Sequence, residues 1–208
     1  MGHSPEGFPT RTAQEFLDLL RAAAAGDPSA FLATHPAALA FAQTPKPSPA
    51  SFAKEAYFGV TAFRFINQQG LARYGRYRIV PQAGVEHLDD ATAKAKDENY
   101  LFEELTHRIA AGPIRLDIRV QIANDSDVVD DATIHWPADR PSAHFGTIVL
   151  TEKAPDDEEH RRLIFDPIPR VDGIEPSDDP LLELRAAIYL LSGRRCRQAA
   201  RIVRADSA

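Results

Sequence analysis

Hydrophobic and polar residues alternate strictly along residues 114–122 (IRLDIRVQI). The apolar members are Ile114, Leu116, Ile118, Val120 and Ile122. A period of two residues is typical of a β-strand that has one buried face and one polar face. We therefore predict a long strand here, with its even-numbered side chains in the core.

Three further segments have the composition of strands. Residues 57–66 are rich in aromatic and branched side chains, and a turn at residues 67–70 (NQQG) separates them from residues 73–80. This arrangement predicts a β-hairpin. Residues 145–151 form the fourth predicted strand, so about four long strands are expected.

Helical patterns occupy much of the remaining chain. Residues 12–25 predict a helix in which Thr12 is the N-cap and Glu15 follows three residues later, as in a capping box. Residues 28–43 predict one or two short helices interrupted at Pro36. Residues 99–111 predict another helix, which Gly112 ends.

The last helix is predicted to begin at a cap among residues 177–179, with Pro180 in its first turn, and to run to about Ser192. Gly193 is its predicted terminator, and residues 194–208 then form a basic tail. Residues 1–12 are expected to be disordered or foreign to the native protein, and the charged residues 156–162 to start a short helix. This mixture of strands and helices predicts a single α+β domain spanning residues 1–208.

Composition narrows the class of protein. The 208 residues are 44% hydrophobic, which is enough for one ordinary core, and the net charge of -6 argues against a nucleic-acid binder. A single cysteine excludes an internal disulfide and a cysteine-rich metal site. The sequence shows neither a signal peptide nor a run of apolar residues long enough for a membrane span, so we expect a soluble, cytoplasmic protein.

Candidate chemistry gathers on the last helix. Helical spacing places Leu182, Arg185, Tyr189 and Ser192 on one stripe. Arg185 lies one turn before Tyr189, where its guanidinium can donate to the phenol oxygen and favour the phenolate. A phenolate is a hard oxygen ligand suited to ferric iron. By spacing alone, such an Arg–Tyr pair is more typical of structural packing than of an iron site.

Several strings of residues occur in a characteristic order. They are residues 35–36 (HP), 57–60 (YFGV), 136–137 (WP), 165–167 (FDP), 173–177 (GIEPS) and 185–189 (RAAIY). Together they resemble segments of the haem catalases, and the short helix-rich ending is similar to that of the catalase-related peroxidases. The resemblance implies the second half of a catalase-like antiparallel β-barrel with flanking helices and a C-terminal helix that carries the proximal tyrosine.

The resemblance also implies roles for individual residues. Tyr189 would be the proximal ligand of the iron of haem b, and Arg185 would hold the phenolate ionised. Ser192 falls where the family has a small hydroxyl residue. Arg194 and Arg195 fall near arginines that reach a haem propionate, although their spacing from Tyr189 is about one residue short. The family's distal histidine belongs to a region before this chain begins, and none of the seven histidines lies in its motif.

The expected function is therefore haem-dependent metabolism of hydrogen peroxide, with an unknown small electron donor. The alternative is a catalytically impaired haem-binding or scaffold member of the family that lacks the distal base. A third class, a binding module acting through the basic tail, has little support because no aromatic residues interleave the arginines. A half-barrel would expose a sheet edge, so we expect homo-oligomers formed through that edge.

Overall fold

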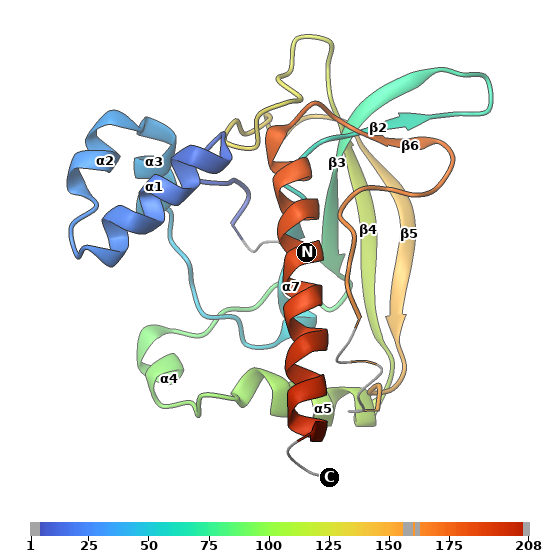
Figure 1. Cartoon of the computed structure of the whole chain (residues 1–208). Helices are drawn as coiled ribbons and strands as arrows, with labels where there is room; N and C mark the ends of the chain where they lie inside the picture. The colour runs from blue at the N-terminus through green and yellow to red at the C-terminus, as the bar shows by residue number, and fades with distance from the viewer. Residues whose placement is uncertain (1–4, 156–159, 161–162, 206–208) are drawn as a thin grey trace.

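The computed structural model describes residues 5–155, 160 and 163–205, in which a β-sheet is flanked by helices (Figure 1). The helices are α1 (Ala13–Ala24), α2 (Ser29–Thr34), α3 (Pro36–Gln43), the 3-10 turn η1 (Phe52–Lys54), α4 (Asp90–Lys94), α5 (Tyr100–Ala111) and α7 (Pro180–Ala205). The strands are β1 (Tyr57–Phe58), β2 (Phe63–Ile66), β3 (Ala72–Pro81), β4 (Ile114–Ile122), β5 (Ser142–Leu150) and β6 (Ile174–Pro176). The predicted charged segment at residues 156–162 lies, apart from His160, outside the described residues.

All strand pairs in the described part of the chain are antiparallel, in the order β5-β4-β3-β2-β6, and β1 also pairs with β3. Three strands, β3, β4 and β5, are long, and the predicted strand at residues 114–122 is confirmed with the same bounds. β5 begins at Ser142, three residues before the predicted start. The predicted α+β class is thus confirmed, with one long strand fewer than expected.

The predicted strand at residues 57–66 is interrupted at residues 59–62. Phe58 pairs with Arg78, whereas Phe63 pairs with Gly75. The chain advances five residues from Phe58 to Phe63, whereas β3 advances only three residues from Gly75 to Arg78. Two extra residues therefore bulge out of the ladder. The bulge directs the chain onto the start of α7, where Val60 packs with Leu181 in a buried cluster.

Two apolar clusters hold the helices on the sheet. Ala53, Ile114 and Leu116 form one cluster, against which α5 packs Leu105 and Ile109. The four-residue spacing of those two side chains places them on one face of α5. The second cluster joins the first turn of α7 to the bulge and to Ala132. The two clusters therefore fix opposite parts of the sheet to different helices.

The N-terminal helices agree with those predicted from the sequence. Thr12 caps α1, and the reciprocal bonds of a capping box with Glu15 are both present. Helices α2 and α3 are separate and meet at Pro36, as predicted. The prediction of disorder was wrong for residues 5–12, because Thr10 is buried and the Phe8 amide donates to the Ala132 carbonyl. Residues 1–4 lie outside the described residues.

The predicted end of the last helix was wrong. Helix α7 continues through Gly193 to Ala205, so most of the predicted basic tail is helical. Gly193 is buried, and a Cβ atom there would overlap the Ile164 side chain. The glycine therefore accommodates the close passage of residues 163–167 across the helix rather than terminating it.

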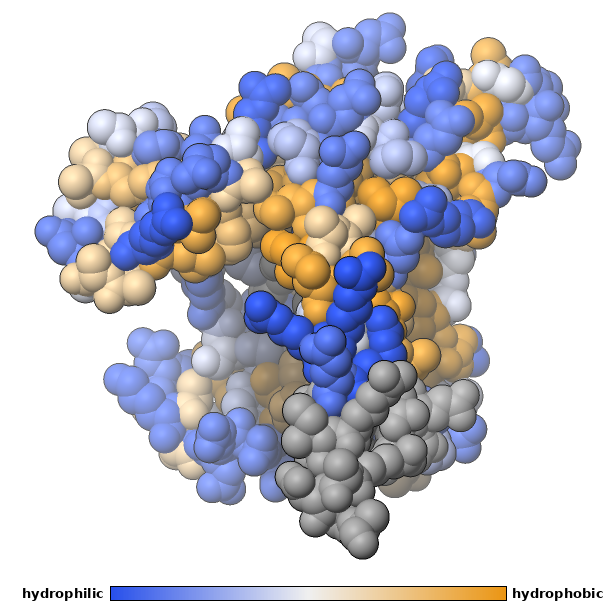
Figure 2. Space-filling model, in the orientation of Figure 1, coloured by the Kyte–Doolittle hydropathy of each residue, from blue (hydrophilic) through white to orange (hydrophobic). Residues whose placement is uncertain are grey.

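The chain exposes an unusually large surface. Its accessible area is 13639 Å², whereas a compact monomer of 22.9 kDa exposes about 9,600 Å². Figure 2 shows hydrophobic side chains at the surface beside α7. Exposed apolar residues of α7 and of the segment that crosses it include Leu163, Phe165, Ile188 and Leu191. None of the helices in the described part of the chain is long and apolar enough to cross a membrane.

Candidate functional site

A cavity of about 750 Å³ lies between one face of the sheet and α7. Gly59, Thr61, Phe63, Tyr77 and Ile79 form its sheet wall. Arg185, Tyr189, Ser192, Gly193 and Cys196 form its helix wall, and residues 163–167 form the third side. Its volume is within the range of cavities that hold cofactors and other small molecules.

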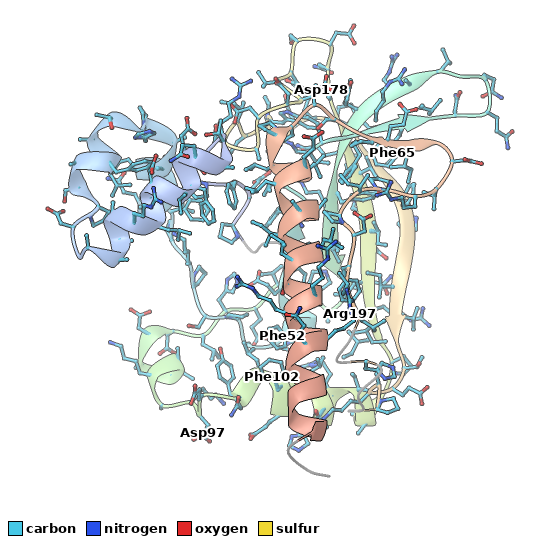
Figure 3. The ribbon with its side chains drawn as sticks, in the orientation of Figure 1. Phe52, Phe65, Asp97, Phe102, Asp178 and Arg197 are labelled. Carbon is cyan, nitrogen blue, oxygen red and sulfur yellow. The ribbon has the colours of Figure 1, made fainter. Side chains whose placement is uncertain are left out.

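The sheet wall is largely aromatic. Tyr77 lies near the centre of a ring cluster, with its centroid 5.6 Å from that of Phe63 and 5.5 Å from that of Phe65. Phe145 of β5 continues the cluster at 5.8 Å from Tyr77. Burial raises the pKa of the Tyr77 phenol, which keeps this side chain neutral. The wall therefore presents the tilted rings of Phe63 and Tyr77 to the cavity, and Phe65 lies beside them on β2 (Figure 3).

The helix wall brings together three of the residues singled out in the sequence. Arg185, Tyr189 and Ser192 line the same cavity, as their helical spacing predicts. The Nη2 atom of Arg185 donates to the Tyr189 hydroxyl at 3.3 Å, and the guanidinium carbon lies 5.7 Å from the Tyr189 ring centroid. A cation thus lies beside a phenol oxygen on the helix wall, with the Ser192 hydroxyl on the same wall.

The structure does not bring Arg194 and Arg195 to this cavity. Both are exposed on α7 and neither is among its lining residues. Arg197 lies nearer, because its Nη1 atom is 3.5 Å from the position that a Cβ atom on Gly193 would take. Figure 3 shows Arg197 on the side of α7 that faces the sheet.

Sequence reasoning missed several lining residues. Cys196 lies seven residues after Tyr189, so helical spacing alone could have placed it on the same face. Thr61 and Tyr77 come from segments more than a hundred residues earlier, and only the fold brings them opposite α7. Asp166 also lines the cavity, but its carboxylate pairs with Arg170 at 2.8 Å.

The start of α7 is anchored by buried polar groups. The Asp179 carboxylate accepts the Leu181 amide at 2.9 Å, which caps the helix, and burial raises the pKa of this carboxyl. The neighbouring Arg76 of β3 is 2% exposed and donates to the carbonyls of Ile134 and Asp131. Burial lowers the pKa of this guanidinium to about 10, so it stays charged at neutral pH.

Arg76 also stacks on an aromatic ring. Its guanidinium carbon lies 4.4 Å from the Trp136 ring centroid, a cation–π distance. Trp136 in turn donates from its indole nitrogen to the Val128 carbonyl at 2.8 Å. The Trp-Pro segment noted in the sequence therefore helps to hold the cation beside the N-terminus of α7.

No histidine of the described residues lines the cavity. Within the same part of the chain, no group of three or more His, Cys, Asp or Glu side chains is placed to hold a metal ion. His3 lies outside the described residues. The chemical groups at the cavity are thus two phenols, a guanidinium, two aliphatic hydroxyls, one thiol and one paired carboxylate.

Comparison with known proteins identifies the family of this chain. The profile of the catalase family matches residues 30–201. The chain belongs to the catalase family. It is 40% identical over 192 residues to a catalase-related peroxidase of Mycolicibacterium paratuberculosis, covering 87% of this chain and 60% of that protein. It is 39% identical to a catalase-related peroxidase of Synechococcus elongatus, covering 69% of this chain and 43% of that protein.

This member of the catalase family thus spans at most about 60% of the length of these two relatives. Solved catalases share its fold. A fungal catalase superimposes with a TM-score of 0.79 at 21% identity, covering 93% of this chain and 44% of that one. Catalase A from Saccharomyces cerevisiae gives a TM-score of 0.78, covering 92% of this chain and 44% of that one. The predicted family and catalase-like fold are therefore confirmed.

Proposed function

We propose that this chain is a haem-dependent, peroxide-metabolising protein of the cytoplasm, with Tyr189 as the iron ligand of haem b. Hydrogen peroxide would be the oxidant and a small molecule the electron donor. The observation that supports the proposal most is the hydrogen-bonded Arg185–Tyr189 pair on the wall of a large apolar cavity in a catalase-family chain.

The residues at the cavity fit a haem group. Haem is a flat, largely apolar molecule, and the side chains of Phe63, Tyr77 and Ile79 offer it apolar contacts on the sheet wall. Its ferric iron accepts a phenolate, and Tyr189 supplies a phenol oxygen beside a fixed cation. The cavity is also large enough for a cofactor of this kind.

The chain's own residues would hold and tune the group. The Arg185 guanidinium would stabilise the Tyr189 phenolate by charge and by a hydrogen bond. The aromatic side chains would exclude water, which strengthens that interaction. Ser192 adds a hydroxyl one turn beyond Tyr189. When bound, haem would supply the redox chemistry that reduces peroxide.

Titration of the purified chain with haemin tests the proposal. We expect a ferric tyrosinate-type spectrum that Tyr189→Phe abolishes. Tyr74→Phe serves as a control, because Tyr74 lies on β3 but does not line the cavity. An unchanged spectrum in Tyr189→Phe, or no such spectrum in the parent chain, would contradict tyrosinate ligation.

A second candidate function is haem binding without efficient turnover. The absence of histidine from the lining residues of the described chain favours it, because peroxide reduction needs a base that moves a proton. If haem binds through Tyr189 but the complex turns over peroxide no faster than free haemin, this second function is supported. Turnover well above that of free haemin supports the enzyme.

A further inference from the structure

We propose that the outer face of α7 docks on an anionic lipid surface. This outer face consists of Leu190, Leu191, Arg194 and Arg195, which are all exposed. The inference goes beyond the proposed haem function, because it concerns what the helix binds on its outside and not what the cavity holds. It also gives a role to Arg194 and Arg195, which do not line the cavity.

The outer face of α7 points away from the cavity. Leu191 and Arg194 follow Tyr189 by two and five residues, so at about 100° per residue they point roughly 200° and 140° away from it. Leu190 and Arg194 lie four residues apart, as do Leu191 and Arg195, so each leucine has an arginine one turn beyond it. The outer face therefore combines apolar and cationic side chains without using any residue that lines the cavity.

The charge of α7 is opposite in sign to that of the whole chain. The chain has a net charge of -6, but residues 184–205 contain six arginines and no aspartate or glutamate. All of these residues belong to α7, so the arginines follow one another along a single helix. Salt screens exposed charges that are more than about 10 Å apart at moderate ionic strength. The helix can therefore attract an anionic surface although the protein as a whole is acidic.

Apolar side chains beside the arginines favour lipid over other anionic partners. Leu190 and Leu191 are 49% and 57% exposed. The segment that passes Gly193 adds Leu163 and Phe165, which are 58% and 75% exposed. Figure 2 shows hydrophobic and hydrophilic side chains next to one another along α7. At a membrane interface, such apolar groups enter the headgroup region while the arginines remain with the lipid phosphates.

A nucleic acid fits this face less well. Its phosphates would attract the arginines, but its bases bind chiefly by stacking on aromatic side chains. The outer face offers leucines instead, and these would gain little apolar contact from a polyanion. The combination of charge and apolar exposure is therefore better matched by lipid.

The polarity of α7 fits a helix that lies on a membrane rather than one that crosses it. None of the helices among the described residues could span a membrane. The same arginines stabilise a helix that lies parallel to the surface, because their charges stay at the level of the headgroups. Such binding also agrees with the proposed cytoplasmic location, since the cytoplasmic leaflet carries anionic lipids.

Co-sedimentation of the chain with vesicles tests the proposal. We expect the parent chain to bind vesicles of mixed phosphatidylserine and phosphatidylcholine, and to be released as the salt concentration rises. Vesicles of phosphatidylcholine alone should bind it at least about 25-fold more weakly, since each of two arginines near an anionic surface contributes about fivefold.

Two double variants remove the two components of the outer face. Arg194→Gln with Arg195→Gln should weaken binding to the mixed vesicles by about 25-fold. Leu190→Ser with Leu191→Ser should weaken it by at least about tenfold, because less apolar surface enters the lipid. All four residues are exposed, so we expect the thermal midpoint of each variant to stay within about 2 °C of the parent.

Matched controls carry the same changes elsewhere on the surface. Arg73→Gln with Arg115→Gln alters the net charge equally, at exposed arginines of β3 and β4. Leu71→Ser with Val85→Ser removes two apolar side chains that are 68% and 49% exposed and lie outside α7. Both control variants should bind the mixed vesicles as the parent does.

The remaining outcomes overturn the proposal. It fails if the parent ignores the mixed vesicles, or if the controls lose as much binding as the outer-face variants. Binding of duplex DNA instead of vesicles, abolished by the double arginine variant, would assign the face to nucleic acid. Self-association without vesicle binding, abolished by the double leucine variant, would make it an interface between copies. Failure of the haem titration would leave this inference intact, because the vesicle experiment uses the chain without haem.

Discussion

Asp179 lies at the point where helix α7 begins, and its carboxyl is almost completely buried. It caps the helix through Leu181, and it feels both the cation of Arg76 and the negative charges of Asp131 and Asp130. Burial raises the pKa of the carboxyl. This effect outweighs the Leu181 hydrogen bond and the charge of Arg76, which both lower it. Ionisation of this residue, which caps the proposed haem-binding helix, therefore lowers the stability of the folded chain.

The raised pKa of Asp179 predicts that the stability of the protein depends on pH. A carboxyl whose pKa is raised by folding stabilises the native state most when it is protonated, below its ordinary value of 3.8. Its contribution falls as pH rises from there through the raised value. Asp179→Asn keeps the capping oxygen but cannot ionise. Relative to the parent, the variant should therefore become progressively more stable between about pH 3 and pH 7 in urea unfolding.

Asp127→Asn is the control with the opposite sign. Hydrogen bonds from Arg140 lower the pKa of Asp127, so its contribution is present above the ordinary value and is lost as pH falls. Relative to the parent, Asp127→Asn should lose stability as pH rises through the ordinary value of 3.8, and should change little above about pH 5. Identical pH profiles for the two variants would contradict the assignment for Asp179.

At the scale of elements, β3 carries the aromatic wall because one of its residues has no side chain. Gly75 is buried, and a Cβ atom there would overlap Val120 and lie 3.1 Å from the Phe65 ring. The glycine lets the Phe65 ring lie over β3, where it contacts Tyr77 edge to face. The packing of the ring cluster behind the cavity thus depends on the glycine at this position of β3.

Gly75→Ala should destabilise the protein by about 1–3 kcal/mol, because an extra methyl group in a filled core displaces its neighbours. It should also weaken haem binding by disturbing Phe65. Gly146→Ala on β5 is the matched control, because a Cβ atom there meets nothing within 4 Å. We expect that variant to change the free energy of unfolding by at most about 0.5 kcal/mol. Equal effects of the two substitutions in urea unfolding would refute the packing argument.

The elements that could be predicted are those whose signals are local. Strict alternation defines β4, and the capping box of Thr12 and Glu15 defines the start of α1. Arg185 and Tyr189 meet because they lie four residues apart on one helix. The end of α7 could not be predicted, since Gly193 has the local signal of a terminator and its actual role is set by contact with Ile164. Such a contact exists only in the folded chain.

The same limit applies to the cavity. Helical spacing specifies one wall, but the opposite wall requires the two-residue bulge before Phe63 and the pairing of β1 and β2 with β3. Nothing local in the sequence around Thr61 indicates that it lines the same cavity as Tyr189. Half of the candidate site was therefore visible in the sequence, and the other half is a consequence of topology.

At the scale of the whole molecule, the sheet keeps open edges. In the described part of the chain, β5 is the end strand on one side and has one neighbour, β4. Nine residues of unpaired backbone invite pairing with another strand. The large exposed area of the chain is consistent with a further contact of this kind. We therefore keep the proposal that the protein forms homo-oligomers through a sheet edge.

Val149→Lys tests this proposal, because a charged residue on an edge strand opposes strand pairing. We expect the parent chain to show concentration-dependent association in sedimentation velocity, and the variant to remain monomeric at the same concentrations. Val128→Lys is the control, since Val128 is equally exposed, at 41% against 40%, but lies in a loop. Association of the Val149 variant at the level of the parent would exclude this edge.

The exposed apolar surface beside α7 has a thermodynamic consequence. The heat capacity of unfolding and the denaturant m-value both grow with the surface that unfolding newly hydrates. Side chains such as Phe165 and Leu191 already contact water in the folded chain, so they contribute little to either quantity. We expect both values to lie well below those typical of 208 residues, giving a broad urea transition and a flat stability curve. Both should rise once the cavity or the open face of the molecule is covered.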